Sequence, residues 1–106
     1  MSAKVYYLRL TDGAPAKEQA LALGRLYEAA GAAHVVDRKD FVAVKLHVGE
    51  KNNDTHVRPE IIKELVDKIK AQGGEPFLTE TSTLYKGERE NAIKHILHAQ
   101  RHGFGI

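Results

Sequence analysis

Residues 41–80 predict the central part of the fold, and their sequence is FVAVKLHVGEKNNDTHVRPEIIKELVDKIKAQGGEPFLTE. It opens with FVAVKLHV at 41–48, a run of β-branched and apolar residues that is typical of a strand. It closes with PFLTE at 76–80, which predicts another strand. Between them a helical pattern begins at Pro59, which suits the first turn of a helix, and ends at Gly73–Gly74. The stretch therefore predicts two strands joined by a helix.

The same alternation continues on both sides of this stretch. VYYLRL at Val5–Leu10 predicts a strand, and a helix is expected from Pro15 to Gly31. After the central stretch, a third helix is predicted from about Glu88 to His102. The order β-α-β-α-β-α indicates parallel strands with right-handed crossovers. We expect one α/β domain over residues 1–106, a small Rossmann-like three-layer fragment with a mostly parallel three-stranded sheet.

Each predicted helix carries apolar residues at helical spacing, and we expect these faces to be buried. They are Leu23, Leu26, Tyr27 and Ala30 in the first helix, Ile62, Leu65, Val66 and Ile69 in the second, and Ala92, Ile93, Ile96 and Leu97 in the third.

Composition limits the classes of protein and of site. The chain has 106 residues, 42% of them apolar and 28% charged, which is ordinary for one small globular domain. Its net charge of +2 comes from dispersed residues, so the charge does not favour a nucleic-acid partner. Cysteine is absent, which excludes disulfides, a cysteine nucleophile, a thiolate zinc site and a cysteine-ligated iron–sulfur cluster within this chain.

Neither a membrane span nor an export signal is evident. No apolar run approaches the roughly 20 residues that cross a bilayer. The first residues, MSAKVYYLRL, lack the charged region, apolar region and small-residue cleavage site of a signal peptide. We therefore expect a cytoplasmic protein with no membrane partner.

Two polar loops follow the last two predicted strands: HVGEKNNDTHVR at 47–58 and TETSTLYKGEREN at 79–91. In open parallel sheets, ligands bind outside the carboxyl ends of the strands, where both loops should lie. The connections from helix to strand carry less chemistry. The pattern favours a ligand site at this end of the sheet, although solvated surface loops remain the alternative.

The predicted strand at 41–48 breaks its apolar pattern at Lys45 and His47. A buried parallel strand should be nearly continuous in apolar residues. Either the two side chains reach solvent, or they face the ligand crevice as acid–base or anion-binding groups. Downstream, Lys51, His56 and Arg58 lie beside a helix N-terminus, which attracts anions, but no phosphate-binding glycine motif is present.

His95, His98 and His102 form a narrow stripe on the last predicted helix. Imidazoles in such a stripe can bind a divalent metal. No carboxylate joins them at an obvious spacing, so a solvated face is the favoured interpretation, and no metal site is predicted.

Three segments together resemble the uncharacterised Fe–S centre proteins, whose N-terminal region is a domain of unknown function. They are VAVKLHVGEKNNDTHVRPE at 42–60, KELVDKIKAQGGEPFLTETSTLYKGERENAIKH at 63–95, and HGF at 102–104. Typical members are several times longer and carry cysteine motifs for ferredoxin-type clusters. The resemblance implies that this chain corresponds to the N-terminal part of a larger fold. No cofactor is expected in this chain, because the cluster belongs only to longer members.

The resemblance also implies a set of shared polar positions. They are Lys45, His47, Glu50, Lys51, Asn53, Thr55, Arg58, Thr81, Thr83, Tyr85, Arg89, Asn91 and His95. Two residues depart from the family's pattern, since Glu80 stands where aspartate is expected and Asn52 where glycine is expected.

Taken together, these features predict a module that binds a small anionic ligand. Lys45, His47, Lys51, His56 and Arg58 would meet the anion. The groups that would orient the ligand or close over it come from both loops: Glu50, Asn53, Thr55, Thr81, Thr83, Tyr85, Arg89, Asn91 and His95.

The competing interpretation is a small hydrolase or lyase. In it His47 is the general base, and Lys45 or Arg58 stabilises developing negative charge. In either case we expect the open sheet edge to be covered by a second copy or by a missing C-terminal portion. A separate redox partner is a further expectation.

Overall fold

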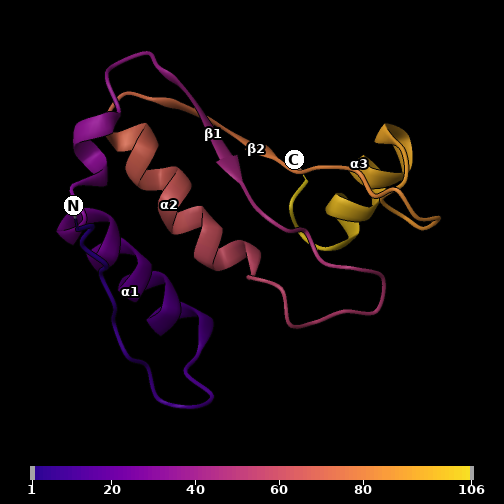
Figure 1. The fold of residues 1–106 in the computed structure, drawn as a ribbon, viewed down its shortest axis with the longest axis horizontal. Coiled ribbons are helices and arrows are strands. Elements are labelled where there is room, and N and C mark those ends of the chain that lie inside the picture. Colours follow the sequence, from indigo (N-terminus) through magenta and orange to yellow (C-terminus); the bar gives the residue numbers. More distant parts are fainter. Residues whose placement is uncertain (1, 106) are drawn as a thin grey trace. The chain divides into compact units, whose positions relative to one another are not determined.

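The computed structural model describes residues 2–105, and its mixture of helices and strands confirms the predicted α/β class (Figure 1). Within those residues, no helix has the length and the apolar composition needed to cross a membrane. The elements, in chain order, are α1 at Ala16–Ala29, the 3-10 helix η1 at Ala32–Val35, β1 at Phe41–Lys45, α2 at Pro59–Ala71, β2 at Glu75–Thr79 and α3 at Ala92–Arg101.

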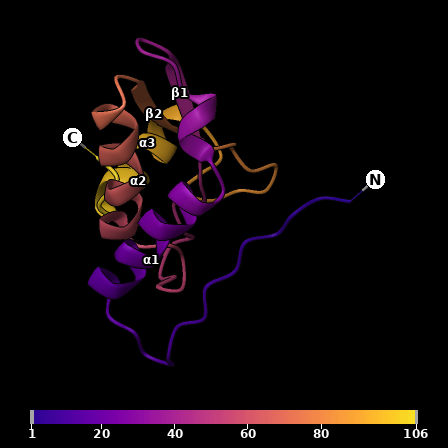
Figure 2. The same cartoon turned by 90° about the vertical axis from the view of Figure 1, so that its left-hand side faces the viewer.

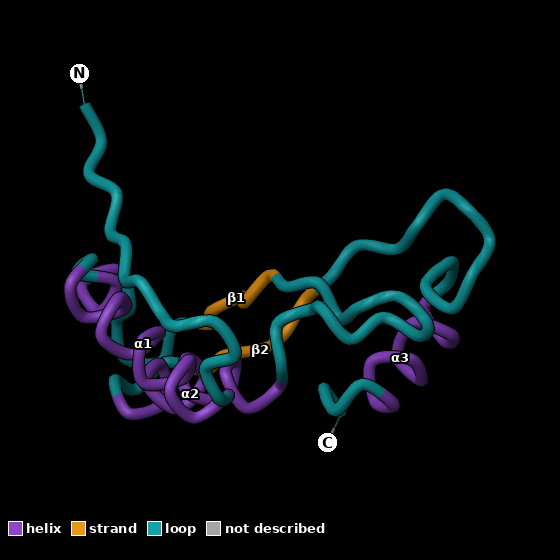
Figure 3. Tube along the Cα trace, turned by 90° about the horizontal axis from the view of Figure 1, so that it is seen from below, coloured by secondary structure: helices purple, strands orange, loops and turns teal. Residues whose placement is uncertain are grey.

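The sheet consists of β1 and β2, which lie side by side in Figure 1 and Figure 3. At one end, the Glu75 N–H donates to the Asp40 carbonyl at 2.7 Å. At the other end, the Leu46 N–H donates to the Thr79 carbonyl at 3.1 Å. The paired numbers rise together along both strands, so the strands are parallel. The central stretch thus forms the predicted strand–helix–strand unit, with α2 beginning at Pro59.

The prediction of a three-stranded sheet is wrong, because Val5–Leu10 forms no strand. Figure 2 shows this segment, in indigo, as an extended chain. Val5 and Tyr7 are 89% and 82% exposed. β-branched and aromatic residues favour extended backbone, but a strand is stable only where a neighbour accepts its hydrogen bonds. Among residues 2–105 the segment has no such neighbour.

The chain forms two compact units, and the first comprises residues up to Val42 together with Glu60–Phe77. In this unit α1 and α2 pack closely at Gly24, where an added Cβ would lie 2.7 Å from the Lys68 side chain. Its core combines residues from both helices and from the segment after η1. The buried apolar residues are Ala22, Tyr27, Val36, Ile61 and Ile69.

The second unit comprises Ala43–Pro59 and the chain from Leu78 onward. Val44, Leu46 and Val48 are buried, whereas the alternate residues Lys45 and His47 are exposed. The two faces of this segment therefore differ as the alternating sequence predicts.

The prediction for the third helix is wrong in its extent and in its buried face. It begins at Ala92 instead of Glu88. Ile93 and Ile96 are 74% and 62% exposed, whereas His95 and His98 are buried. The cause is that His98 and His102 bond to the carbonyl groups of Gly49 and Val48, which turns the histidine side of α3 inward.

Candidate ligand-binding site

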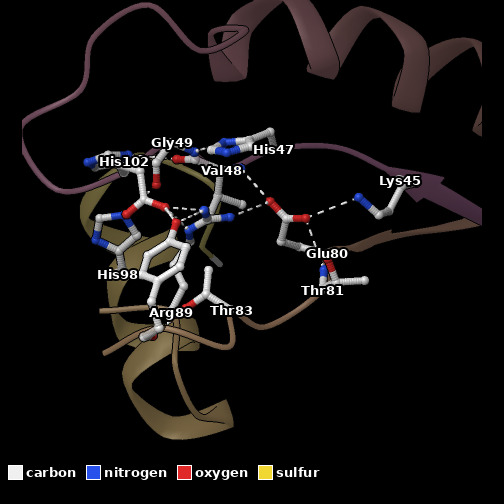
Figure 4. Close-up of polar contacts among 12 residues, drawn as sticks. Lys45, His47, Val48, Gly49, Glu80, Thr81, Thr83, Arg89, His98 and His102 are labelled. Atoms are coloured by element: carbon white, nitrogen blue, oxygen red, sulfur yellow. Dashed lines mark hydrogen bonds and ion pairs between the residues drawn. The ribbon is translucent and has the colours of Figure 1, made fainter. Parts of the chain in front are cut away.

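The two polar loops come together through Arg89, which precedes α3 (Figure 4). Its Nε donates to Glu50 Oε1 at 2.9 Å, and Glu50 belongs to the loop after β1. Its NH1 group donates to Glu80 Oε2 at 3.2 Å, and Glu80 directly follows β2. Arg89 is only 6% exposed. A buried guanidinium between two carboxylates fixes the loops relative to each other.

Glu80 is the most heavily bonded of these carboxylates. It accepts hydrogen bonds from Lys45 Nζ at 3.1 Å and from the backbone N–H groups of Val48 at 3.2 Å and Thr81 at 2.9 Å. Burial pushes the pKa of Glu80 upward, but these donors outweigh burial and hold the pKa below its usual value. Glu80 is therefore an ionised group on which several chain segments converge.

Glu50 is held by the second loop. Tyr85 donates its hydroxyl hydrogen to Glu50 Oε1, and Arg89 NH2 donates both to Glu50 and to the Tyr85 oxygen, the latter at 3.1 Å. Hydrogen bonds lower the pKa of Glu50, and the bond from Tyr85 contributes more than the bond from Arg89. We call Lys45, Glu50, Glu80, Tyr85 and Arg89 the carboxylate–arginine cluster. The two cations, Lys45 and Arg89, balance the two carboxylates. Arg89 and Tyr85 both donate hydrogen bonds to carboxylates of the cluster.

Histidines of α3 hold the backbone of the loop after β1. His98 Nε2–H donates to the Gly49 carbonyl at 2.6 Å, and His102 Nδ1–H donates to the Val48 carbonyl at 2.6 Å. A carbonyl oxygen can only accept, so both nitrogens carry hydrogen. Of residues 2–105, no group of three or more histidine, aspartate or glutamate side chains has the arrangement of a metal site. His98 and His102 therefore position the loop, a role that the sequence did not predict.

Gly49 lies among imidazole rings. The rings of His56 and His102 stack with centroids 4.8 Å apart and an interplanar angle of 10°. Gly49 has φ +88°, and an added Cβ would lie 2.6 Å from His56 Nδ1 and 2.8 Å from His102 Nδ1. Both the backbone conformation and the available space therefore require glycine at this position.

The groups around Gly49 are imidazoles and, beside His56, the guanidinium of Arg58. Burial lowers the pKa of His56, and the charges of His102, Arg58 and His47 lower it further. No carboxylate among residues 2–105 forms an ion pair with His56, Arg58 or His102. We call His47, His56, Arg58 and His102 the Gly49 cluster. Unlike the carboxylate–arginine cluster, it has no internal counter-charge.

The other predicted residues have local roles or are exposed. Asn91 accepts a hydrogen bond from the Lys94 N–H at 3.0 Å and so caps α3. Asn53 donates to Thr55 Oγ1 at 2.9 Å, and Thr83 donates to the Tyr85 carbonyl at 3.0 Å. The rest are Lys51 and Thr81, which are exposed, and His95, which is buried.

Asn52, where the family's pattern led us to expect glycine, has φ +62°. Asparagine tolerates this left-handed conformation better than most residues, so the turn after Lys51 is kept.

Comparison with known proteins gives one match. The profile of the domain of unknown function DUF362 matches residues 42–105, which run from β1 to the segment after α3. Neither the curated proteins nor the solved structures include a match to the chain. The matched part covers 64 of the 106 residues and includes both clusters. The chain belongs to the DUF362 family.

Proposed function

We propose that the chain is an anion-binding module whose ligand, a small phosphate or carboxylate, is held by the Gly49 cluster. The observation that carries the proposal is the gathering of three imidazoles and Arg58, in which His56, Arg58 and His102 form no ion pair with a carboxylate among residues 2–105. Arg58 carries a permanent positive charge, and protonation of His56 near it is unfavourable unless an anion offsets that charge. A bound phosphate or carboxylate would supply that charge and accept hydrogen bonds from the guanidinium and imidazoles.

The surrounding contacts support this role by holding the loop in place before a ligand arrives. Arg89 links the two loops, and His98 and His102 hold the carbonyls of Gly49 and Val48. A loop that is already ordered loses less conformational entropy on binding. The carboxylate–arginine cluster thus acts as support, and the Gly49 cluster meets the ligand.

The sequence resemblance supports a wider role for the chain. The chain would be the Rossmann-like N-terminal part of a cytoplasmic ferredoxin-type Fe–S centre protein. Since this chain has no cysteine, the cluster ligands would come from another segment or from a redox partner. A second copy could instead cover the open edge of the two-stranded sheet.

The alternative of a hydrolase or lyase has less support from the geometry. His47 Nδ1 accepts a hydrogen bond from the Gly49 N–H at 2.8 Å. In a neutral imidazole the other nitrogen, Nε2, then carries the hydrogen. Such a ring presents a donor instead of a free base, so binding is the function that we favour.

The test is a titration of the full ¹⁵N-labelled chain with inorganic phosphate at about pH 6, where histidines begin to be protonated. We expect saturable shifts of the Gly49, His56 and His102 amide signals. Arg58→Gln should weaken binding about tenfold, equivalent to ~1.4 kcal/mol, because it removes a permanent positive charge.

The matched control is Arg25→Gln, which removes the same charge from the exposed surface of α1. This variant should bind phosphate as the wild type does. If both substitutions weaken binding equally, or if phosphate shifts no signal near Gly49, the proposal is wrong.

A further inference from the structure

We infer that the second unit has another ligand site, a pocket between α3 and the ends of β1 and β2 that binds a neutral, largely apolar small molecule with one hydrogen-bonding group. This site is distinct in chemistry from the Gly49 cluster and goes beyond the proposed anion-binding function. All of the residues that line it belong to the second unit.

The shape of the pocket fits a small molecule. Its volume is about 460 Å³, within the roughly 300–1,000 Å³ typical of small-molecule sites. Its walls combine residues that follow β1, residues of β2 and α3, and the segment after α3. The large apolar residues among them are Leu46, Val48, Leu78, Ile96 and Phe104.

In the proposed complex, His95 supplies the hydrogen-bonding group of the protein. It lines the pocket, is only 9% exposed, and its buried Nε2 has no hydrogen-bond partner among residues 2–105. Burial lowers the pKa of His95, so the ring is neutral near pH 7. A buried polar atom without a partner is unfavourable, and a ligand that reaches it gains a hydrogen bond in an apolar setting.

The charges of the lining explain why the ligand should not be an anion. No lysine or arginine lines the pocket, whereas the ionised Glu80 does. Arg89 and Lys45 already pair with Glu80, so the pocket offers no further cation to hold an anion. The Gly49 cluster should therefore bind an anion and the pocket a neutral molecule, and binding at each site can be measured separately.

The test uses the neutral fluorescent amine N-phenyl-1-naphthylamine with the full chain. We expect a saturable rise in fluorescence that excess inorganic phosphate does not reverse. Ala99→Phe should weaken binding about tenfold or more, because the phenyl group fills the pocket. Ala29→Phe adds the same group to an exposed position of α1 and should leave binding unchanged.

The role of His95 is tested with 1-benzylnaphthalene, which has a methylene group in place of the amine. The analogue displaces the dye, and in the wild type its dissociation constant should be higher than that of the dye. In His95→Leu the two dissociation constants should be equal. Circular dichroism checks that both variants are folded, and the comparison of two ligands within one variant does not depend on equal stability.

Two results would overturn the inference. One is that Ala99→Phe binds the dye as tightly as Ala29→Phe does. The other is that dye binding falls as the chain dimerises at higher concentration, as measured by sedimentation, which would make a second copy the occupant. Failure of phosphate binding would affect only the Gly49 cluster.

Discussion

The helices α2 and α3 have similar apolar periodicity but opposite packing. In α2 the buried residues are Ile61 and Ile69, with 8% and 3% of their surface exposed. In α3 the buried residues are His95 and His98, and Ile96 is 62% exposed. Helix α2 packs by burying apolar surface, and helix α3 packs by donating hydrogen bonds to the loop after β1. The difference shows that periodicity identifies a helix but does not decide which face is buried.

The packing of α3 is linked to the buried charges before it. Arg89 lies shortly before α3 in the sequence and pairs with Glu80, and His98 on α3 donates to the Gly49 carbonyl. A set of buried polar groups is stable only when its members are paired. We therefore expect the second unit to depend on its polar contacts as much as the first depends on its apolar core.

The largest effect is expected when the buried charge is removed. Arg89→Met should destabilise the chain by about 4 kcal/mol, because Glu80 is left buried with fewer partners. The measurement is the free energy of unfolding from urea titration, followed by signals of both units.

Lys68→Met is the matched control in the first unit. Lys68 pairs with Glu28, which is largely exposed, so the loss should be clearly smaller. Equal losses for Arg89→Met and Lys68→Met would contradict the structural role of the carboxylate–arginine cluster.

A smaller effect should separate the two helices directly. Ile69→Ala removes a side chain that is 3% exposed and should cost about 3 kcal/mol of unfolding free energy. Ile96→Ala makes the same change at a side chain that is 62% exposed and should cost less than about 0.5 kcal/mol. If the order of the two losses were reversed, the packing described for α3 would be wrong.

Local sequence signals predicted the central part of the fold. Pro59, the Gly73–Gly74 pair and the β-branched run at 41–48 indicated the strand–helix–strand unit, because they act through nearby backbone. The prediction of a strand at Val5–Leu10 was wrong because it also relied on local sequence alone. The composition of this segment favours extended backbone, but pairing depends on a sheet edge that local sequence does not contain.

The candidate site was predictable in its place but not in its contacts. Parallel topology brings the loops after β1 and β2 to the same end of the sheet, and Arg89 does meet Glu50. The sequence could not show that Arg89 pairs with two carboxylates, so that its charge is not available to a ligand. Nor could it show that His98 and His102 bond to backbone carbonyls, although their stripe on an otherwise apolar helix was a signal.

The most direct test of the anion site is the side-chain pKa of His56, measured by NMR with and without inorganic phosphate. In the free protein, burial and the charges of His102, Arg58 and His47 hold this pKa below its usual value of 6.5. A bound phosphate favours the protonated ring, so the pKa should rise and phosphate should bind more tightly as the pH falls. A pKa that is unchanged or lowered at saturating phosphate would contradict the proposal.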